Sequence, residues 1–158
     1  MTGYTSNLTE KTEMIEIPTG FSPLFRSSPF LETIGPLYSR GSGEILVLGL
    51  RVAHKHTNAR GLVHGGVLST LADVALGYAM ESTARESNSL VTANLSLDFA
   101  GSAKLDDWIE TKVDIQKIGS RLAFANAYLF VGTNRIVRAS AVFLVVEKRS
   151  PALPQSDV

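Results

Sequence analysis

The sequence predicts an α+β domain in which a long antiparallel sheet is wrapped around a single central helix. Two observations carry this prediction. The twenty residues from Gly61 to Met80 are mostly apolar, and Asp73 is the one formally charged residue among them. After this run the period changes to two, and four strand-like segments follow one another along the chain. A helix that is apolar nearly all round is a buried helix, so we expect the sheet to cover it.

Two segments ahead of the helix have recognisable patterns. Residues 21–31 hold three phenylalanines and two prolines, and they predict a short helical turn that packs on the body of the domain. Residues 44–52 are rich in isoleucine, valine and leucine and predict a strand. The buried helix itself is expected from about Gly65 to Ser82.

The segments after the helix alternate as half-buried strands do. In residues 90–100 one face is predicted to carry Val91, Ala93, Leu95, Leu97 and Phe99. The other face of that strand is predicted to carry Thr92, Asn94, Ser96 and Asp98. Residues 108–118 alternate in the same way, and Gly119-Ser120 predicts a two-residue hairpin with glycine first. Residues 121–131 and 136–146 complete the predicted meander.

Composition limits the class of protein. With 158 residues, 44% of them hydrophobic, the chain forms one domain with a substantial core, over residues 21–149. Residues 1–20 and 150–158 lack periodicity and predict flexible ends. Fifteen basic and fifteen acidic residues balance, which argues against a nucleic-acid partner. The absence of cysteine excludes disulfides and thiol catalysis and fits a reducing compartment. The segment around Asp73 is too polar for a membrane span, and we expect a cytoplasmic protein without membrane insertion.

The central helix carries the candidate chemistry. A buried carboxylate at Asp73 must find partners, because an isolated buried charge is very costly, and such groups are candidates for catalysis. Ser69, Asp73 and Gly77 lie four apart on one stripe, so small residues leave space beside the carboxylate. The first N–H groups of a helix lack intrahelical partners, and the glycine pair Gly65-Gly66 lets a ligand carbonyl approach them closely.

These residues resemble a known family. The segment from Asn58 through His64, Gly65 and Gly66, followed by Leu71-Ala72-Asp73, resembles the motif of hotdog-fold acyl-CoA thioesterases of the phenylacetate-degradation (PaaI) type. The resemblance covers residues 21–148. It implies a hotdog fold and hydrolysis of an acyl-CoA to free acid and CoA.

The resemblance also implies roles for individual residues. The Gly65 backbone N–H would polarise the thioester carbonyl, with Asn58 beside it, and Asp73 would be the catalytic carboxylate. Thr92 falls where some members carry a serine that helps to place the attacking water. Asp106 departs from the family, which usually has glycine at that position.

Each role has a plainer alternative. Asp73 could be a structural hydrogen-bonding hub, the glycines could serve packing alone, Asn58 could cap a turn, and Thr92 could be an ordinary strand residue. His64 is expected at the helix entrance, as a scaffold or substrate-contacting residue beside Gly66. His54 and His56 alternate on a strand end without an evident third ligand, so we predict no metal site.

Coenzyme A is then part of the substrate, and no cofactor is expected. Its phosphates need cations, and the candidates near strand ends or hairpins are Lys104, Lys117, Arg121, Lys148 and Arg149, with Gly119 at the hairpin itself. A non-catalytic acyl-CoA-binding or regulatory hotdog protein is the alternative function. A hotdog hydratase or dehydratase is a third possibility.

Helix geometry predicts how the site is assembled. Gly65 and Asp73 are eight residues apart, which is about 12 Å along one helix. A carbonyl held by the Gly65 N–H would therefore lie too far from the same chain's Asp73 for attack at about 3 Å. A two-fold homodimer with antiparallel helices resolves this by sharing each site between two chains. The family resemblance implies that such dimers often pair again into a homotetramer.

Overall fold

The protein is described by a computed structural model over residues 16–84 and 88–147. Within these ranges there are two α-helices, α1 (Pro29–Ile34) and α2 (Gly65–Thr83), and two short 3-10 turns, η1 (Gly43–Ile45) and η2 (His54–His56). The strands are β1 (Ser22–Pro23), β2 (Leu37–Arg40), β3 (Val47–Arg51), β4 (Asn88–Phe99), β5 (Trp108–Ile118), β6 (Leu122–Val131) and β7 (Asn134–Glu147). Lys148, Arg149 and the predicted tail lie outside the described residues, as does most of the predicted N-terminal segment.

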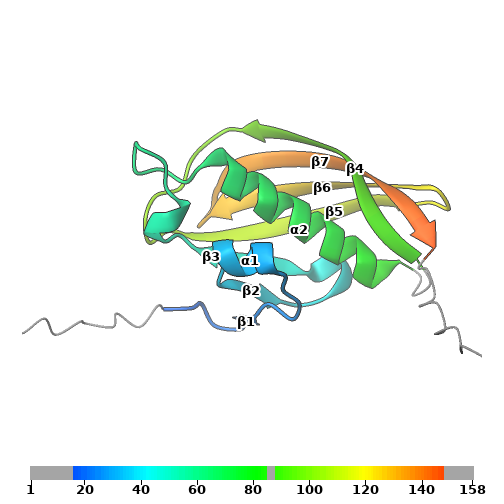
Figure 1. Cartoon of the computed structure of the whole chain (residues 1–158), viewed down its shortest axis with the longest axis horizontal. Helices are drawn as coiled ribbons and strands as arrows, with labels where there is room; N and C mark the ends of the chain where they lie inside the picture. The colour runs from blue at the N-terminus through cyan, green and yellow to red at the C-terminus, as the bar shows by residue number, and fades with distance from the viewer. Residues whose placement is uncertain (1–15, 85–87, 148–158) are drawn as a thin grey trace, which may run out of the picture.

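All strands pair antiparallel in one sheet of order β1-β2-β3-β5-β6-β7-β4, and α2 lies along one face of that sheet (Figure 1). The predicted α+β architecture with one long central helix is confirmed. The predicted simple meander holds for β5, β6 and β7 but is wrong for β4. Strand β3 pairs with β5, for example through Gly49 and Glu110. Strand β4 therefore lies at an edge of the sheet, where it pairs with β7.

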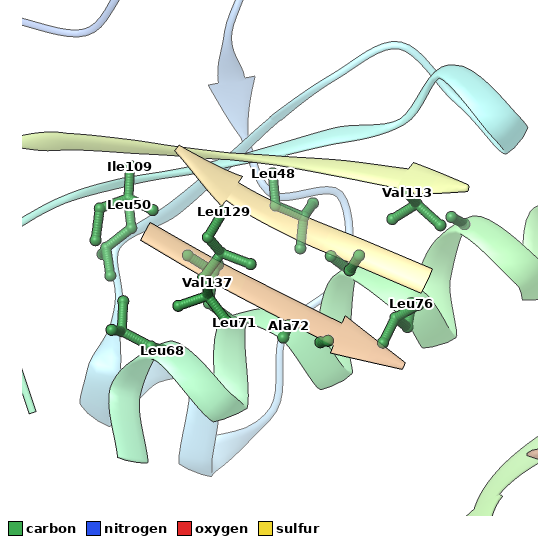
Figure 2. Packing of buried hydrophobic residues seen from close by; sticks show 14 of the residues in the cluster. Leu48, Leu50, Leu68, Leu71, Ala72, Leu76, Ile109, Val113, Leu129 and Val137 are labelled. Carbon is green, nitrogen blue, oxygen red and sulfur yellow. The ribbon is translucent and has the colours of Figure 1, made fainter. Parts of the chain in front are cut away.

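The core lies between α2 and the sheet. The buried side of the helix consists of Leu68, Leu71, Ala72, Ala75, Leu76, Ala79 and Met80. These residues belong to one core cluster with sheet residues such as Leu48, Ile109, Leu129 and Val137. Figure 2 shows Leu68, Leu71, Ala72 and Leu76 of the helix together with these sheet residues. Full burial of one leucine side chain stabilises the fold by about 1.5–3 kcal/mol, so this interface contributes strongly to the stability of the fold.

The other side of α2 is not covered by the sheet. Ser69, Asp73, Gly77 and Tyr78 are half-buried. The prediction of a helix buried all round is therefore wrong for a single chain, because the sheet packs on one side of α2 only. Burial on the far side would need a further surface.

The N-terminal half contains more elements than the sequence indicated. Residues 22–23 pair with β2, a strand that was not predicted, and the helical turn begins later, at Pro29. The Ser28 hydroxyl caps α1 by accepting from the Leu31 N–H at 3.3 Å. The strand predicted over 44–52 begins at Val47, because the residues before it form η1.

The hairpin between β5 and β6 is shifted by one residue from the prediction. Ile118 pairs with Ala123, and the Gly119 N–H donates to the Leu122 carbonyl at 2.9 Å. Ser120 and Arg121 therefore form the tip of the hairpin. Gly119 does not have a positive φ, so the expected turn with glycine first is wrong.

Candidate active site

The Asp73 carboxylate projects from the middle of α2 toward β4. Its Oδ1 accepts a hydrogen bond from the Thr92 hydroxyl at 2.9 Å. A hydrogen bond to a carboxylate is stronger than one between neutral groups, and it fixes the orientation of the acceptor. The second oxygen, Oδ2, has no hydrogen-bond partner among the described residues. The carboxylate is therefore oriented by one oxygen and open for chemistry at the other.

A β-bulge places Thr92 on the helix side of the sheet. The pairing between β4 and β7 shifts between Thr92 and Asn94, which leaves Ala93 as the extra residue. Leu90 before the bulge and Leu95 and Leu97 after it all pack against the core. The strict alternation predicted for residues 90–100 is thus wrong before the bulge, because one extra residue reverses the faces. Without the bulge Thr92 would point away from Asp73.

The N-terminus of α2 forms the second part of the site. His64 is the N-cap, and its Nδ1 accepts from the Gly66 N–H at 3.1 Å. The Gly65 N–H has no acceptor among the described residues. It therefore remains an unsatisfied donor at the positive end of the helix dipole, where a carbonyl oxygen that gains negative charge would be stabilised. His64 is exposed and acts here as a cap, which agrees with the scaffold alternative.

A tight loop leads into this helix. The Asn58 Oδ1 accepts from the Arg60 N–H at 2.8 Å, and the Asn58 N–H donates to the Leu62 carbonyl at 2.7 Å. Gly61 has a φ of 73°, which glycine adopts without steric cost. Asn58 thus caps the turn, as its plainer alternative held, while its side-chain amide nitrogen makes no hydrogen bond within the described ranges and stays available to a ligand.

His56 anchors this loop, although the sequence pattern gave it no role. It is 1% exposed, its Nδ1 accepts from the Ala53 N–H at 2.9 Å, and its Nε2 lies 2.6 Å from the Ile34 carbonyl oxygen. This arrangement needs the neutral ring with its proton on Nε2. Burial lowers the pKa of His56 below its ordinary value, although the bond to Ile34 opposes the shift. The His56 carbonyl also accepts from the His64 N–H at 2.8 Å, so the anchor and the helix cap are directly connected.

Lys104 lies at the same end of α2. Lys104 forms an isolated antiparallel β-bridge with Leu62, next to the helix entrance. The Lys104 N–H donates to the Asp107 carboxylate at 2.8 Å. Asp106 in this turn has a φ of 68°, the left-handed conformation that glycine adopts most readily. The departure from the family pattern thus falls where the backbone favours glycine, and in this chain aspartate adopts that conformation.

Gly119 and Arg121 lie at the opposite end of the molecule. They belong to the β5–β6 hairpin, which borders the C-terminal end of α2 (Figure 1). A cavity of about 520 Å³ there is lined by Thr83, Ala84, Asn88, Ile118, Gly119 and Ser120. Within one chain, therefore, the predicted CoA-contacting residues are divided between both ends of the helix.

No group of three or more potential metal ligands occurs among the described histidine, aspartate and glutamate residues. No helix in the described part of the chain is long and apolar enough to cross a membrane. The chemistry suggested by the geometry is that of an oriented carboxylate and a backbone donor for a carbonyl oxygen.

Comparison with known proteins identifies the family of this chain. A family model described as "Thioesterase superfamily" matches residues 60–137, which include α2, β4, β5 and β6. A putative esterase of Pseudomonas aeruginosa is 47% identical over 131 residues, which cover 82% of this chain and 98% of that protein. The chain belongs to the thioesterase superfamily. Another superfamily relative, acyl-coenzyme A thioesterase 13 of Mus musculus, is 27% identical over 82% of this chain and 86% of its own.

Solved structures show the same fold. A point mutant of the phenylacetic acid degradation protein PaaI of Thermus thermophilus matches with a TM-score of 0.67 at 19% identity, over 74% of this chain and 98% of that one. A hypothetical thioesterase of Streptococcus pneumoniae, solved with coenzyme A, has a TM-score of 0.65 at 22% identity, over 72% and 91% of the two chains. The predicted hotdog fold of the PaaI type is confirmed.

Proposed function

We propose that this protein hydrolyses the thioester of an aryl- or fatty acyl-CoA to the free acid and CoA. The observation that carries the proposal is the Asp73 carboxylate, oriented by Thr92 at 2.9 Å on the same helix whose first N–H, at Gly65, is unsatisfied. A relative named acyl-coenzyme A thioesterase and a structural neighbour solved with coenzyme A support this substrate class. In this proposal CoA is part of the substrate, and no separate cofactor takes part.

The proposed reaction needs two groups that act on one thioester. The carbonyl oxygen accepts from the Gly65 N–H, and the negative charge that develops on this oxygen is stabilised there. Asp73 either removes a proton from the attacking water or attacks the carbonyl carbon itself to give an anhydride that water then opens. On both routes the carbon–sulfur bond breaks, a carbon–oxygen bond to a water oxygen forms, and the CoA sulfur receives a proton. Thr92 keeps the carboxylate in place.

We further propose that two chains share each site. Eight residues of helix separate Gly65 from Asp73 by about 12 Å, which is too far for one carbonyl to reach both in the same chain. The half-buried stripe of Ser69, Asp73 and Gly77 supports a second α2 packed antiparallel on that side. The twelve-residue edge strand β4, which pairs with β7 on one side only in the described structure, supports a dimer as well.

In this dimer the far ends of the two chains meet. The Gly119–Arg121 hairpin of one chain would approach the Asn58 loop and Lys104 of its partner. That arrangement would reunite the predicted CoA-contacting residues, and their cations would face the CoA phosphates.

An exposed apolar patch on the outer face of the sheet supports a further pairing into a tetramer. Val91 pairs with Leu144, and Leu144 pairs with Leu122, so these side chains lie in one row across three strands. They are 50%, 45% and 40% exposed. Contiguous exposed apolar surface of this kind marks interaction sites. We propose that the same row of a second dimer packs against it.

The test of the proposed function is release of free thiol from a panel of aromatic and aliphatic acyl-CoAs. We expect turnover by the wild type and a loss of about 100-fold or more in kcat for Asp73→Asn, which keeps the shape of the side chain but removes its basicity. Asp98→Asn is the matched control, because Asp98 lies on β4 in an exposed ion pair with Arg138 and should leave the rate unchanged.

Two outcomes would contradict the proposal. An Asp73→Asn variant that keeps more than about a tenth of the wild-type rate would show that the assigned carboxylate is not the reacting group. A wild-type protein that binds acyl-CoAs but releases no thiol from any of them would favour the non-catalytic binding alternative.

A further inference from the structure

The aromatic ring of Phe99 lies over the N-terminus of α2. A Cβ atom added at Gly65 would lie 3.4 Å from the Phe99 Cζ, 3.6 Å from its Cε1 and 4.0 Å from its Cε2. No other heavy atom is among the three nearest, so the ring is the surface that bounds the space beside the Gly65 backbone. The missing side chain of Gly65 thus leaves a slot about one methyl group deep between backbone and ring.

Phe99 differs from the other apolar residues on its side of β4. Leu95 and Leu97 are partly buried against the core, whereas Phe99 is 53% exposed. Large apolar side chains with free surface next to an unsatisfied backbone donor are the ordinary composition of a ligand site, in which apolar walls surround a few polar groups. The free surface of the ring and the open Gly65 N–H border the same space.

We infer that Phe99 is a specificity-determining residue that restricts the shape of the acyl group next to the thioester carbonyl. The inference rests on the proposed function. When the carbonyl oxygen accepts from the Gly65 N–H, the carbon atom attached to the carbonyl lies in or beside the slot. The slot admits a planar or unbranched carbon at this position, and a methyl branch there meets the ring. The chemical class selected is therefore aryl and straight-chain acyl thioesters over thioesters that are branched at the α-carbon.

The experiment compares isomers of equal carbon number. Thiol release is measured with butyryl-CoA against isobutyryl-CoA and with hexanoyl-CoA against 2-methylpentanoyl-CoA. The ratio of kcat/KM for the straight isomer to that for the branched isomer is determined within each variant. The ratio is independent of the fraction of active protein, so partial unfolding or a general loss of activity does not change it.

We expect the wild type to favour the straight isomer and Phe99→Ala to lower that preference by about 10-fold or more, which is the range for one methyl group in a pocket. Phe99→Leu should lie between the two. Gly65→Ala keeps the backbone N–H and fills the slot, so the preference should rise, and adding Phe99→Ala to it should remove the increase. Phe130→Ala removes a ring of the same size on β6 and should leave the ratio unchanged.

The outcomes separate this inference from the proposed function. If the wild type hydrolyses acyl-CoAs and both Phe99 variants keep its ratio within about twofold, the inference is wrong and the function stands. If Phe130→Ala lowers the ratio as much as Phe99→Ala does, selection by the ring over Gly65 is likewise refuted. If no acyl-CoA is hydrolysed at all, the proposed function fails and the inference fails with it.

Discussion

The Gly65 end and the Asp73 end of the candidate site lie on one helix, yet the chain builds them in different ways. The Gly65 end is made from backbone, and its immediate contacts, the His64 cap and the Asn58 turn, each span two residues, while His56 fastens the loop to Ile34. The Asp73 end is made from side chains, and its contact joins residues nineteen positions apart. A local motif therefore specifies the donor, whereas the orientation of the carboxylate depends on the register of a distant strand.

The largest expected loss of activity comes from removal of the backbone donor at Gly65. Gly65→Pro removes the backbone N–H and should lower kcat by about 100- to 1000-fold. Proline suits the first position of a helix, and His64 before it has φ −66° and ψ 136°, the extended conformation that proline requires of its predecessor. Gly65→Ala is the matched control, because it adds a Cβ at the same place and keeps the N–H. The two rates are compared by thiol release and the two folds by circular dichroism.

Equal rates for the proline and alanine variants would contradict a role for the N–H. In that case any loss of activity would come from the added carbon atom and its contact with Phe99.

A smaller effect is expected at Thr92, which orients the carboxylate but does not react. Thr92→Val removes the hydroxyl at nearly constant shape and should lower kcat by about 10-fold, the scale of one hydrogen bond to a charged group that is partly exposed to solvent. Thr92→Ser keeps the hydroxyl and should retain most of the rate. Steady-state kinetics with one acyl-CoA would decide this, and a valine variant as active as the serine variant would show that Asp73 needs no orientation from β4.

The pH dependence of stability tests whether His56 anchors the loop that leads to Gly65. Because burial lowers the pKa of His56 in the folded state, protonation favours the unfolded chain. The contribution of His56 to the free energy of unfolding is complete above its ordinary pKa of about 6.5 and declines as the pH falls from there toward the lowered value. Urea unfolding of the wild type and of His56→Gln between pH 7 and pH 5 should show a decline that is steeper in the wild type. Parallel pH profiles of the two proteins would contradict this account.

The sequence predicted these two ends unequally well. The first residue of α2, the bounds of β5 and the glycine pair followed from local patterns, since an apolar run after a turn and strict alternation depend on neighbouring residues alone. The Thr92–Asp73 contact did not follow from alternation. The pattern of residues 90–100 placed Thr92 on the outer face, and the family resemblance rather than the periodicity indicated its role.

Three of the remaining errors share one physical cause. A bulge, the position of β4 beside β7 and the pairing of β1 with β2 are set by contacts between distant segments, which a local pattern does not encode. Phe99 was assigned correctly to the face that it shares with Leu95 and Leu97. Its position over Gly65 could not be predicted from the sequence, because the fold brings together residues that are 34 positions apart.

The central claim is that the Gly65 N–H of one chain and the Asp73 carboxylate of its partner act on the same thioester. Complementation tests it most directly. Gly65→Pro and Asp73→Asn are placed in two copies with different affinity tags, co-expressed, and purified through both tags so that mixed dimers are retained. Each variant alone should be nearly inactive. In a mixed dimer one shared site contains both substitutions and the other contains neither. About half of the wild-type activity per dimer should therefore return. Mixed dimers that form and remain inactive would place each site within a single chain and contradict the account.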